Sequence, residues 1–263
     1  MSIPIFVISL KDSEKRRRSI ATSLNKIGVN FEFFDAVYGA GLEPQEIENL
    51  CDSEALRKNP RWLNRGAIGC SLSHYYLYKK IVDENIDGAI ILEDDMMLDH
   101  RFLEVLGFLE KRNCKDNEVV MLYYRSFSKL QFKRLNDIGK TGLHIAQPLT
   151  DSDIPITTGG YYVTSAACKS LATFILPVRV TADSWNYFLK EGALESIKVV
   201  YPRILSDGSF KSVIDYNQAY KNGFIANLSR LLNSRNIPLI SYILKSRRKK
   251  LENSMSEFEL TER

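Results

Sequence analysis

The sequence lacks the features that identify a secreted, disulfide-rich or membrane-spanning protein. Its four cysteines, Cys51, Cys70, Cys114 and Cys168, form no C-x-x-C pair. This spacing excludes a zinc ribbon and a thioredoxin-type redox site and favours reduced thiols in the cytosol. No apolar run reaches the ~18 residues of a membrane-spanning helix. The first residues have no basic region and no small-residue cleavage site, so we expect a cytoplasmic protein without a signal peptide.

A large net charge is also missing. The 263 residues carry 36 Lys and Arg against 32 Asp and Glu, a formal charge of +4, which is too small to indicate a nucleic-acid partner. The patterns of a P-loop NTPase, a zincin and an α/β-hydrolase are absent from the sequence. Gly39-Ala-Gly41 resembles the start of a dinucleotide fingerprint, but Pro44 stands in place of its third glycine, so we reject a Rossmann cofactor site.

Strand and helix patterns alternate over the first 125 residues, which predicts an α/β fold with a mainly parallel sheet flanked by helices. Residues 42–65 are expected to be irregular, and residues 125–157 to hold an antiparallel excursion or a mobile loop. The expected regular elements are strands at 3–10, 31–37, 89–92, 119–124, 161–164 and 197–201, helices that begin near 13, 69, 99 and 184, and a helical stripe over 168–175.

Acidic residues are absent from 216–251, where basic residues alternate with apolar ones. Basic charge beside an apolar stripe is typical of a segment that lies on an anionic membrane. A solvated C-terminal helix with a basic end is the alternative. We therefore divide the chain into a domain over 1–222 and a basic amphipathic helical segment over 223–263. We expect peripheral binding at the inner face of the cytoplasmic membrane.

Three consecutive carboxylates, Glu93, Asp94 and Asp95, directly follow a buried strand. Ligands of open α/β sheets bind at the carboxyl edge of the strands, and neighbouring carboxylates raise one another's pKa unless a cation relieves the repulsion. Mg²⁺ and Mn²⁺ prefer oxygen ligands and leave positions open for phosphates. The triplet therefore predicts a cation site that carries a phosphorylated ligand; a solvated acidic turn is the alternative.

Other candidates have competing explanations. The arginines at 16–18 open a helix, where cations oppose the helix dipole, so a docking polyanion explains them as well as a solvated face does. His74 shares a helix face with apolar residues, which favours a core histidine. Gly159 and Gly160 precede an aromatic strand, where a ligand could approach the backbone or a simple turn could form.

Six short blocks occur in order over about residues 5 to 210. The blocks are Ile8-Ser9-Leu10 with Arg16, Phe33-Phe34-Asp35-Ala36, Gly66-Ala67-Ile68-Gly69-Cys70-Ser71-Leu72-Ser73-His74, Ile91-Leu92-Glu93-Asp94-Asp95, Thr158-Gly159-Gly160-Tyr161-Tyr162-Val163, and Asp183. In these blocks the sequence resembles glycosyltransferase family 25, the lipooligosaccharide galactosyltransferase family. The Gly-Cys-x-x-Ser-His block together with Glu-Asp-Asp is the most specific part.

The resemblance implies a GT-A fold, a UDP-sugar donor, Mn²⁺ or Mg²⁺, and inversion at the anomeric carbon. It implies metal ligation by Asp94 and Asp95, with Asp207 as a late ligand or a determinant of acceptor preference, since Gln is common there in the family. Asp183 is the expected base, with Asp151 and Asp153 as alternatives and a helix N-cap as its other explanation. The residues implied in donor binding are Leu10, Arg16, Ser73, His74, Asp94, Gly159 and Gly160.

The expected function is therefore transfer of a sugar, galactose in most of the family, to a lipid-linked saccharide in lipooligosaccharide or LPS biosynthesis. One alternative is a non-catalytic protein of the same fold that binds a sugar nucleotide or an anionic lipid. Another is a metal-dependent phosphohydrolase, which usually needs more carboxylate or histidine ligands. The sequence departs from the family at Ala67, where Glu is frequent, and at Ala182, where Val is usual.

Overall fold

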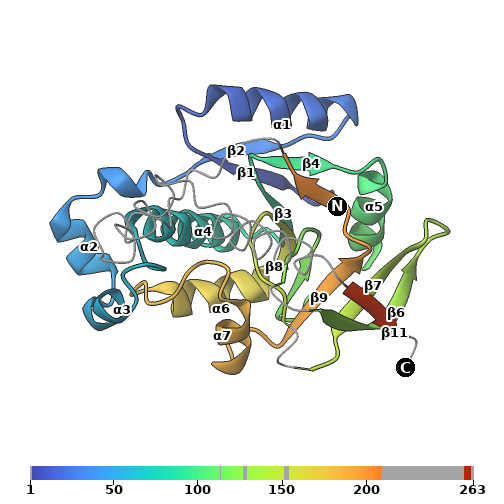
Figure 1. The fold of residues 1–263 in the computed structure, drawn as a ribbon. Helices are drawn as coiled ribbons and strands as arrows, with labels where there is room; N and C mark the ends of the chain where they lie inside the picture. Colours follow the sequence, from blue (N-terminus) through green and yellow to red (C-terminus); the bar gives the residue numbers. More distant parts are fainter. Residues whose placement is uncertain (1, 113, 127–128, 151–153, 209–257, 262–263) are drawn as a thin grey trace, which may run out of the picture.

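The computed structural model describes residues 2–112, 114–126, 129–150, 154–208 and 258–261. They form an α/β fold in which helices flank a large central sheet (Figure 1). The order of strands across this sheet is β11-β6-β7-β9-β5-β8-β3-β1-β2. The strands are β1 (Ile5–Ser9), β2 (Glu32–Asp35), β3 (Gly88–Glu93), β5 (Glu118–Met121), β6 (Leu130–Ile138), β7 (Leu143–Pro148), β8 (Gly160–Thr164), β9 (Ser196–Tyr201) and β11 (Phe258–Thr261).

Among these described strands, β7 and β8 alone run against the common direction. The predicted α/β class with a mainly parallel sheet is thus confirmed. The antiparallel excursion expected within 125–157 is the β6–β7 pair. A separate two-stranded sheet joins β4 (Met96–Leu98) to β10 (Leu205–Asp207).

The helices differ from the prediction mainly before residue 65. They are α1 (Glu14–Lys26), α2 (Pro44–Leu50), α3 (Ser53–Lys58), α4 (Arg65–Asp83), α5 (Phe102–Arg112), α6 (Ser165–Ile175) and α7 (Trp185–Lys190), with a 3-10 turn η1 (Gly39–Gly41). The expectation of irregular chain over 42–65 is wrong, because local caps start two helices there: Pro44 opens α2, and the Asp52 carboxylate accepts from the Ala55 backbone N–H. Helix α4 begins at Arg65 rather than Gly69, since Asn64 caps it.

Alternate residues of β1 face the two sides of the sheet, and each side has its own core. Ile5 and Val7 pack in the cluster that includes α1 and α5 residues. Phe6 and Ile8 pack in the larger cluster that includes residues of α4 and α6. Figure 1 shows these helix pairs on opposite sides of the sheet. A strand buried on both faces reads as a continuous apolar run, as the sequence does here.

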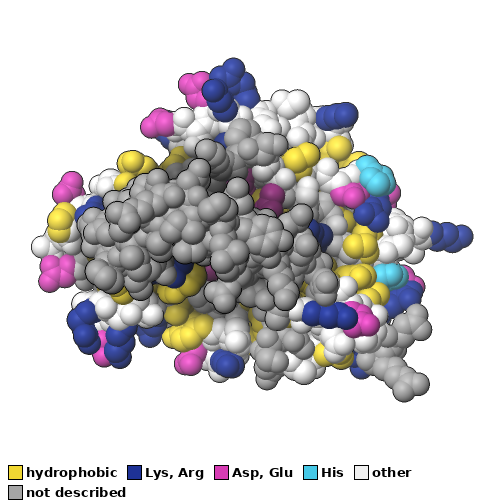
Figure 2. Space-filling view, in the orientation of Figure 1, with side chains coloured by type: hydrophobic (Ala, Val, Ile, Leu, Met, Phe, Trp, Pro, Cys, Tyr) yellow, Lys and Arg dark blue, Asp and Glu magenta, His cyan; other side chains and the backbone are white. Residues whose placement is uncertain are grey.

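The predicted basic helical segment over 223–263 can be compared with the structure only at residues 258–261. Residues 209–257, which include the boundary at 222 and most of the basic segment, lie outside the described residues. Phe258–Thr261 pair parallel with β6, so the prediction of a helical segment is wrong for these four residues. No helix that the structure describes is long and apolar enough to cross a bilayer. On the face in Figure 2, the described Lys and Arg side chains lie among Asp and Glu rather than in a patch of one sign.

Candidate active site

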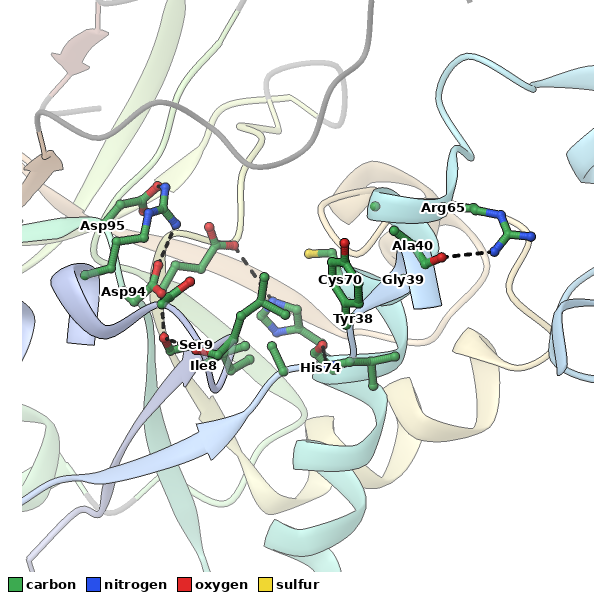
Figure 3. Close-up of a pocket in the computed structure, with 18 of the residues that line it drawn as sticks. Ile8, Ser9, Tyr38, Gly39, Ala40, Arg65, Cys70, His74, Asp94 and Asp95 are labelled. Carbon is green, nitrogen blue, oxygen red and sulfur yellow. Dashed lines mark hydrogen bonds and ion pairs between the residues drawn. The ribbon is translucent and has the colours of Figure 1, made fainter. Parts of the chain in front are cut away.

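The carboxyl ends of the parallel strands β1, β2 and β3 border a cavity of about 500 Å³, which we call the first cavity. Its wall comes from the end of β1, the start of α1, the loop after β2, the first half of α4 and the acidic triplet (Figure 3). This is the edge where open α/β sheets bind ligands. The predicted residues Leu10, Arg16, Ser73, His74 and Asp94 line this cavity.

Arg16 joins the triplet to the first helix. Its two terminal nitrogens donate to Asp94 Oδ1 at 2.6 Å and to Asp95 Oδ2 at 3.0 Å. The other oxygen of Asp94 accepts from Ser9 Oγ at 2.6 Å (Figure 3). Arg17 instead ties β1 to β2, because it donates to the Ser9 carbonyl at 2.9 Å and contacts Asp35. Of the three consecutive arginines, Arg16 thus binds the acidic triplet beside the cavity, and Arg17 links β1 to β2 at the edge of the sheet.

Asp95 is the electrostatically unfavourable member of the triplet. Burial and the charge of Glu93 raise the pKa of Asp95 to about 6, although Arg16 opposes the rise. Its Oδ1 atom is buried and has no hydrogen-bond partner among the described residues. An unsatisfied carboxylate oxygen beside two further carboxylates fits a hard divalent cation, which takes oxygen ligands. In the chemistry of their donor atoms, these residues suit the Mg²⁺ or Mn²⁺ that the resemblance implies.

Asp207 reaches the triplet through the small sheet. The antiparallel register of β4 and β10 places Asp207 opposite Met96, and the Gly208 N–H donates to the Asp95 carbonyl at 2.7 Å. Tyr123 Oη donates to Asp207. In the described part of the chain, Asp95 and Asp207 belong to no set of three ligand atoms within 4.8 Å of one another. The expected metal ligands are neighbours but do not form a converged site.

A second cavity of about 430 Å³ adjoins the first, and Cys70, Glu93 and Asp95 line both. Asp183 and Asp207 line only the second. The predicted base and the predicted late ligand therefore lie on the other side of the triplet from the first cavity.

Asp183 is not the cap of the following helix. Ser184 occupies the N-cap position of α7, and Asp183 Oδ1 accepts from Thr181 Oγ1 at 2.6 Å. Of the alternatives to Asp183, Asp151 and Asp153 lie outside the described residues. Thr157, in the wall of the same cavity, has a φ of 90°, a conformation that non-glycine residues rarely adopt and that is concentrated at functional sites.

Ser73 and His74 act from one face of α4. Ser73 Oγ donates to the Gly69 carbonyl at 2.6 Å and accepts from the Val37 N–H at 2.8 Å, so it holds the loop that follows β2. His74 is fully buried, and its Nδ1 lies 2.8 Å from Tyr161 Oη. The prediction of a core position for His74 is confirmed, but the expected hydrogen bonding is incomplete, because Nε2 has no hydrogen-bond partner among the described residues. Ser73 and His74 both line the first cavity.

Gly159 and Gly160 line neither cavity, so the structure does not support their predicted donor contact. A Cβ on Gly159 would lie 2.7 Å from the Tyr123 ring, and a Cβ on Gly160 would lie 2.2 Å from Leu205. These glycines make room for side chains of the core. Close packing of the core is therefore sufficient to account for glycine at both positions, and their contact with a donor stays a prediction.

Sequence reasoning missed two residues of the first cavity. Tyr38 lines it and is 62% exposed. Arg65 also lines it and donates to the Ala40 carbonyl at 3.3 Å (Figure 3). The available signal for Tyr38 was an aromatic residue directly after a predicted strand. No sequence pattern pointed to Arg65, because its place beside the cavity depends on how α4 packs on η1.

A model of glycosyltransferase family 25, described as an LPS biosynthesis protein family, matches residues 2–185. The chain belongs to glycosyltransferase family 25. It is 33% identical over 180 residues to procollagen galactosyltransferase 1-B of Xenopus laevis, covering 64% of this chain and 27% of that protein. It is 27% identical over 176 residues to the lipooligosaccharide biosynthesis protein lic2B of Haemophilus influenzae, covering 65% of this chain and 62% of that protein.

These matches cover about a quarter of the length of the procollagen galactosyltransferases and about three fifths of lic2B. Among solved structures, a glycosyltransferase involved in glycosylation of the major capsid of PBCV-1 aligns with 76% of this chain and 82% of its own, at 13% identity and a TM-score of 0.32. That likeness is too low to carry an argument. The resemblance drawn from the six blocks is confirmed by the family model.

Proposed function

We propose that this family 25 protein is an inverting, metal-dependent glycosyltransferase of GT-A type. It would move a sugar, galactose, from a UDP-sugar to a lipid-linked saccharide of lipooligosaccharide or LPS. The observation that carries this proposal is the pair of cavities that meet at Glu93 and Asp95. Two substrates that react with each other need two adjoining sites, and the reacting groups must meet where the sites join.

The first cavity suits the nucleotide. Tyr38 offers an exposed aromatic ring to its wall, on which a uracil base can stack, since every base has a π-face. Arg16 stands at the other end of the wall, beside the triplet. A guanidinium pairs well with phosphate oxygens. The diphosphate would then lie between Arg16 and the triplet, and the sugar would point toward the second cavity.

Asp94 and Asp95, with Asp207 nearby, would hold the cation. A bound Mg²⁺ or Mn²⁺ neutralises the charge that develops on the departing diphosphate. Arg16 currently bridges the two aspartates, and it would turn one or both nitrogens to the diphosphate when the donor binds. Its position at the helix start, unfavourable for a cation, is explained by that exchange of partners.

The second cavity suits the acceptor. Asp183 would take the proton from the acceptor hydroxyl as that oxygen bonds to the anomeric carbon and the bond to the β-phosphate oxygen breaks. Thr181 donates to Oδ1 of Asp183 and so holds the carboxylate in place. Ala67 and Ala182 both line this cavity. Small side chains there leave room for a saccharide, and they are the natural place for differences in acceptor preference within the family.

The direct test is release of UDP and transfer of label from radiolabelled UDP-galactose, with Mn²⁺ and with or without a saccharide acceptor. Asp95→Asn should lower kcat/KM by at least about 100-fold and remove the Mn²⁺-dependent gain in UDP binding. Asp83→Asn, which changes an exposed carboxylate on α4, is the matched control and should behave as the wild type. Unchanged turnover in Asp95→Asn would refute the metal assignment. Absence of transfer and of UDP release with every UDP-sugar would favour a non-catalytic binding protein.

A further inference from the structure

The wall between the two cavities holds a set of ligand atoms of a different chemical kind from the triplet. One sulfur, one nitrogen and one carboxylate oxygen, from Cys70, His74 and Glu93, lie within 4.8 Å of one another. Cys70 and His74 are one helical turn apart on α4, and Figure 3 shows both beside the cavity. Glu93 ends β3. A helix face and a strand end thus bring together a soft, a borderline and a hard ligand.

His74 points to a ligand at this place. Its side chain is only 1% exposed, and its Nε2 has no hydrogen-bond partner in the part of the chain that the structure describes. That nitrogen lies 3.9 Å from Glu93 Oε1, too far for a hydrogen bond. A buried polar atom without a partner destabilises the folded protein. Ligand atoms around a tetrahedral Zn²⁺, at bond lengths of about 2.0–2.3 Å, are separated by somewhat less than 4 Å, so small movements would close the site.

The neighbours of these ligands are those that a metal site needs. Tyr161 Oη lies 2.8 Å from the other ring nitrogen of His74, and Tyr78 Oη lies 2.6 Å from Tyr161 Oη. If His74 Nδ1–H donates along this chain, the Nε2 lone pair is free for a cation. Thr158 Oγ1 donates to Glu93 at 2.6 Å. Hydrogen bonds of this type orient the ligands of metal sites.

We propose that Cys70, His74 and Glu93 form a binding site for a thiophilic divalent cation of the Zn²⁺ class, separate from the oxygen-lined position at Asp94 and Asp95. Three protein ligands leave a fourth position open, and it faces the cavities because Cys70 and Glu93 line both. Burial, with the charges of Glu93 and Asp183, raises the pKa of the Cys70 thiol. The thiol therefore stays protonated until the cation binds and its proton passes to the solvent.

A second set of possible ligands differs in a decisive way. Cys114, Asp116 and Glu118 also lie within 4.8 Å of one another. However, both oxygens of Glu118 are already occupied by Arg112, and Lys198 adds a second positive charge. A cation there would have to displace two others. Cys114, which belongs to this second set, therefore serves as a control for the proposed ligand Cys70.

The test is a titration of the metal-free, full-length protein with Co²⁺ and then Zn²⁺, followed by the thiolate-to-cobalt absorption band. The wild type should bind one equivalent and show the band, and Zn²⁺ should remove it. Cys70→Ser should lose the band, whereas Cys114→Ala should keep it. Glu93→Gln, a second variant that leaves the thiol in place, should bind at least about tenfold more weakly. Circular dichroism checks that each variant is folded.

The outcomes are decisive in both directions. No band in the wild type, a band that survives in Cys70→Ser, or a band that disappears in Cys114→Ala would each overturn the site. Asp95→Asn should keep the cobalt band while it loses Mn²⁺-dependent UDP binding. The titration uses neither UDP nor a saccharide. The proposed Zn²⁺ site can therefore be refuted while the proposed transferase activity is upheld, and the activity can be refuted while the Zn²⁺ site is upheld.

Discussion

Asp95 and His74 each carry a buried polar atom without a hydrogen-bond partner among the described residues, Oδ1 in one and Nε2 in the other. Folded proteins satisfy nearly all such atoms, and the exceptions call for an explanation. Asp95 lines both cavities, and His74 lines the first. We take the Asp95 atom as support for the proposed Mg²⁺ or Mn²⁺ position and the His74 atom as support for the proposed Zn²⁺ site.

A single substitution tests the proposed role of Asp183 as the base. Asp183→Asn keeps the side-chain size but removes the proton acceptor, so kcat should fall about 10²–10⁴-fold. UDP binding and the melting temperature should hardly change, because Ser184 rather than Asp183 occupies the cap position of α7. Single-turnover kinetics and UDP titration measure the two effects separately. A variant with wild-type kcat would show that another group takes the proton.

Among the helices and strands, α4 contributes most to the site. Its glycine and serine contact the loop that follows β2, and its histidine lines the first cavity. Gly69 lets the backbone of η1 approach: a Cβ there would lie 2.7 Å from both the Gly39 nitrogen and the Val37 carbonyl oxygen. Ser73 then holds the same loop by its hydrogen bond to Val37. The Gly-Cys-x-x-Ser-His block therefore has two roles: it packs against the loop that follows β2, and it forms part of the cavity wall.

Gly69→Ala should destabilise the protein by about 1–3 kcal/mol, since the added methyl group meets backbone that cannot easily move. Gly107→Ala, in α5, is the matched control, because nothing lies within 4 Å of its added Cβ. It should stabilise by about 0.5–1 kcal/mol through helix propensity. Urea unfolding of both variants gives the comparison. Equal stability of the two would contradict this account of the close helix–loop contact.

At the scale of the whole molecule, long-range pairing assembles the site. Strand β8 lies between β3 and β5 and brings Thr158 to Glu93. The β4–β10 pair brings Asp207 to the triplet. Glu118 similarly joins three parts of the molecule, because Arg112 of α5 and Lys198 of β9 both donate to it. Its side chain is completely buried.

Glu118→Gln should cost about 3 kcal/mol, because it leaves two cations without their buried partner. Burial alone would raise the pKa of Glu118, but the hydrogen bonds from Arg112 and Lys198 outweigh it and lower the pKa. The stabilisation is therefore complete above the ordinary pKa of 4.5 and is lost as the pH falls below it.

Urea unfolding as a function of pH measures this effect. The difference in stability between the wild type and Glu118→Gln should be constant at neutral pH and should shrink in acid. Glu54→Gln, at an exposed ion pair with Lys58, is the control and should change stability by less than about 1 kcal/mol. If the difference in unfolding free energy between the wild type and Glu118→Gln became larger in acid, the assigned charge pairing would be contradicted.

The basic segment is the other whole-molecule feature, and its membrane role stays a prediction. Replacing Arg247 and Arg248 by Gln should weaken binding to anionic vesicles, measured by sedimentation, about 30-fold, because each basic residue near such a surface contributes about 1 kcal/mol. Replacing Lys58 and Lys79, which are exposed on the described helices, should have little effect. Vesicles of neutral lipid should bind neither form. Equal loss for both pairs of replacements would argue for a general charge effect.

Local patterns were sufficient for β1 and β3, whereas over 125–157 they left an antiparallel excursion and a mobile loop as alternatives. A continuous apolar run indicates a strand buried on both faces wherever that strand lies in the sheet. The helices α2 and α3 were missed because each is short and neither buries a residue completely. Their caps were present in the sequence, but without a wide apolar stripe a cap is a weak signal.

Residue types and their order along the chain were enough to establish the α/β class, the position of the acidic triplet at a strand end and, through the six blocks, the family. These depend on residue type and on neighbours along the chain. Four other features became evident only from the folded chain. Arg16 and Ser9 hold Asp94, Asp207 lies beside the triplet, Gly159 and Gly160 pack against core side chains, and Cys70, His74 and Glu93 come together. Each of these depends on strand order and on the packing of α4, because contacts between residues far apart in the chain arise only when the sheet is assembled.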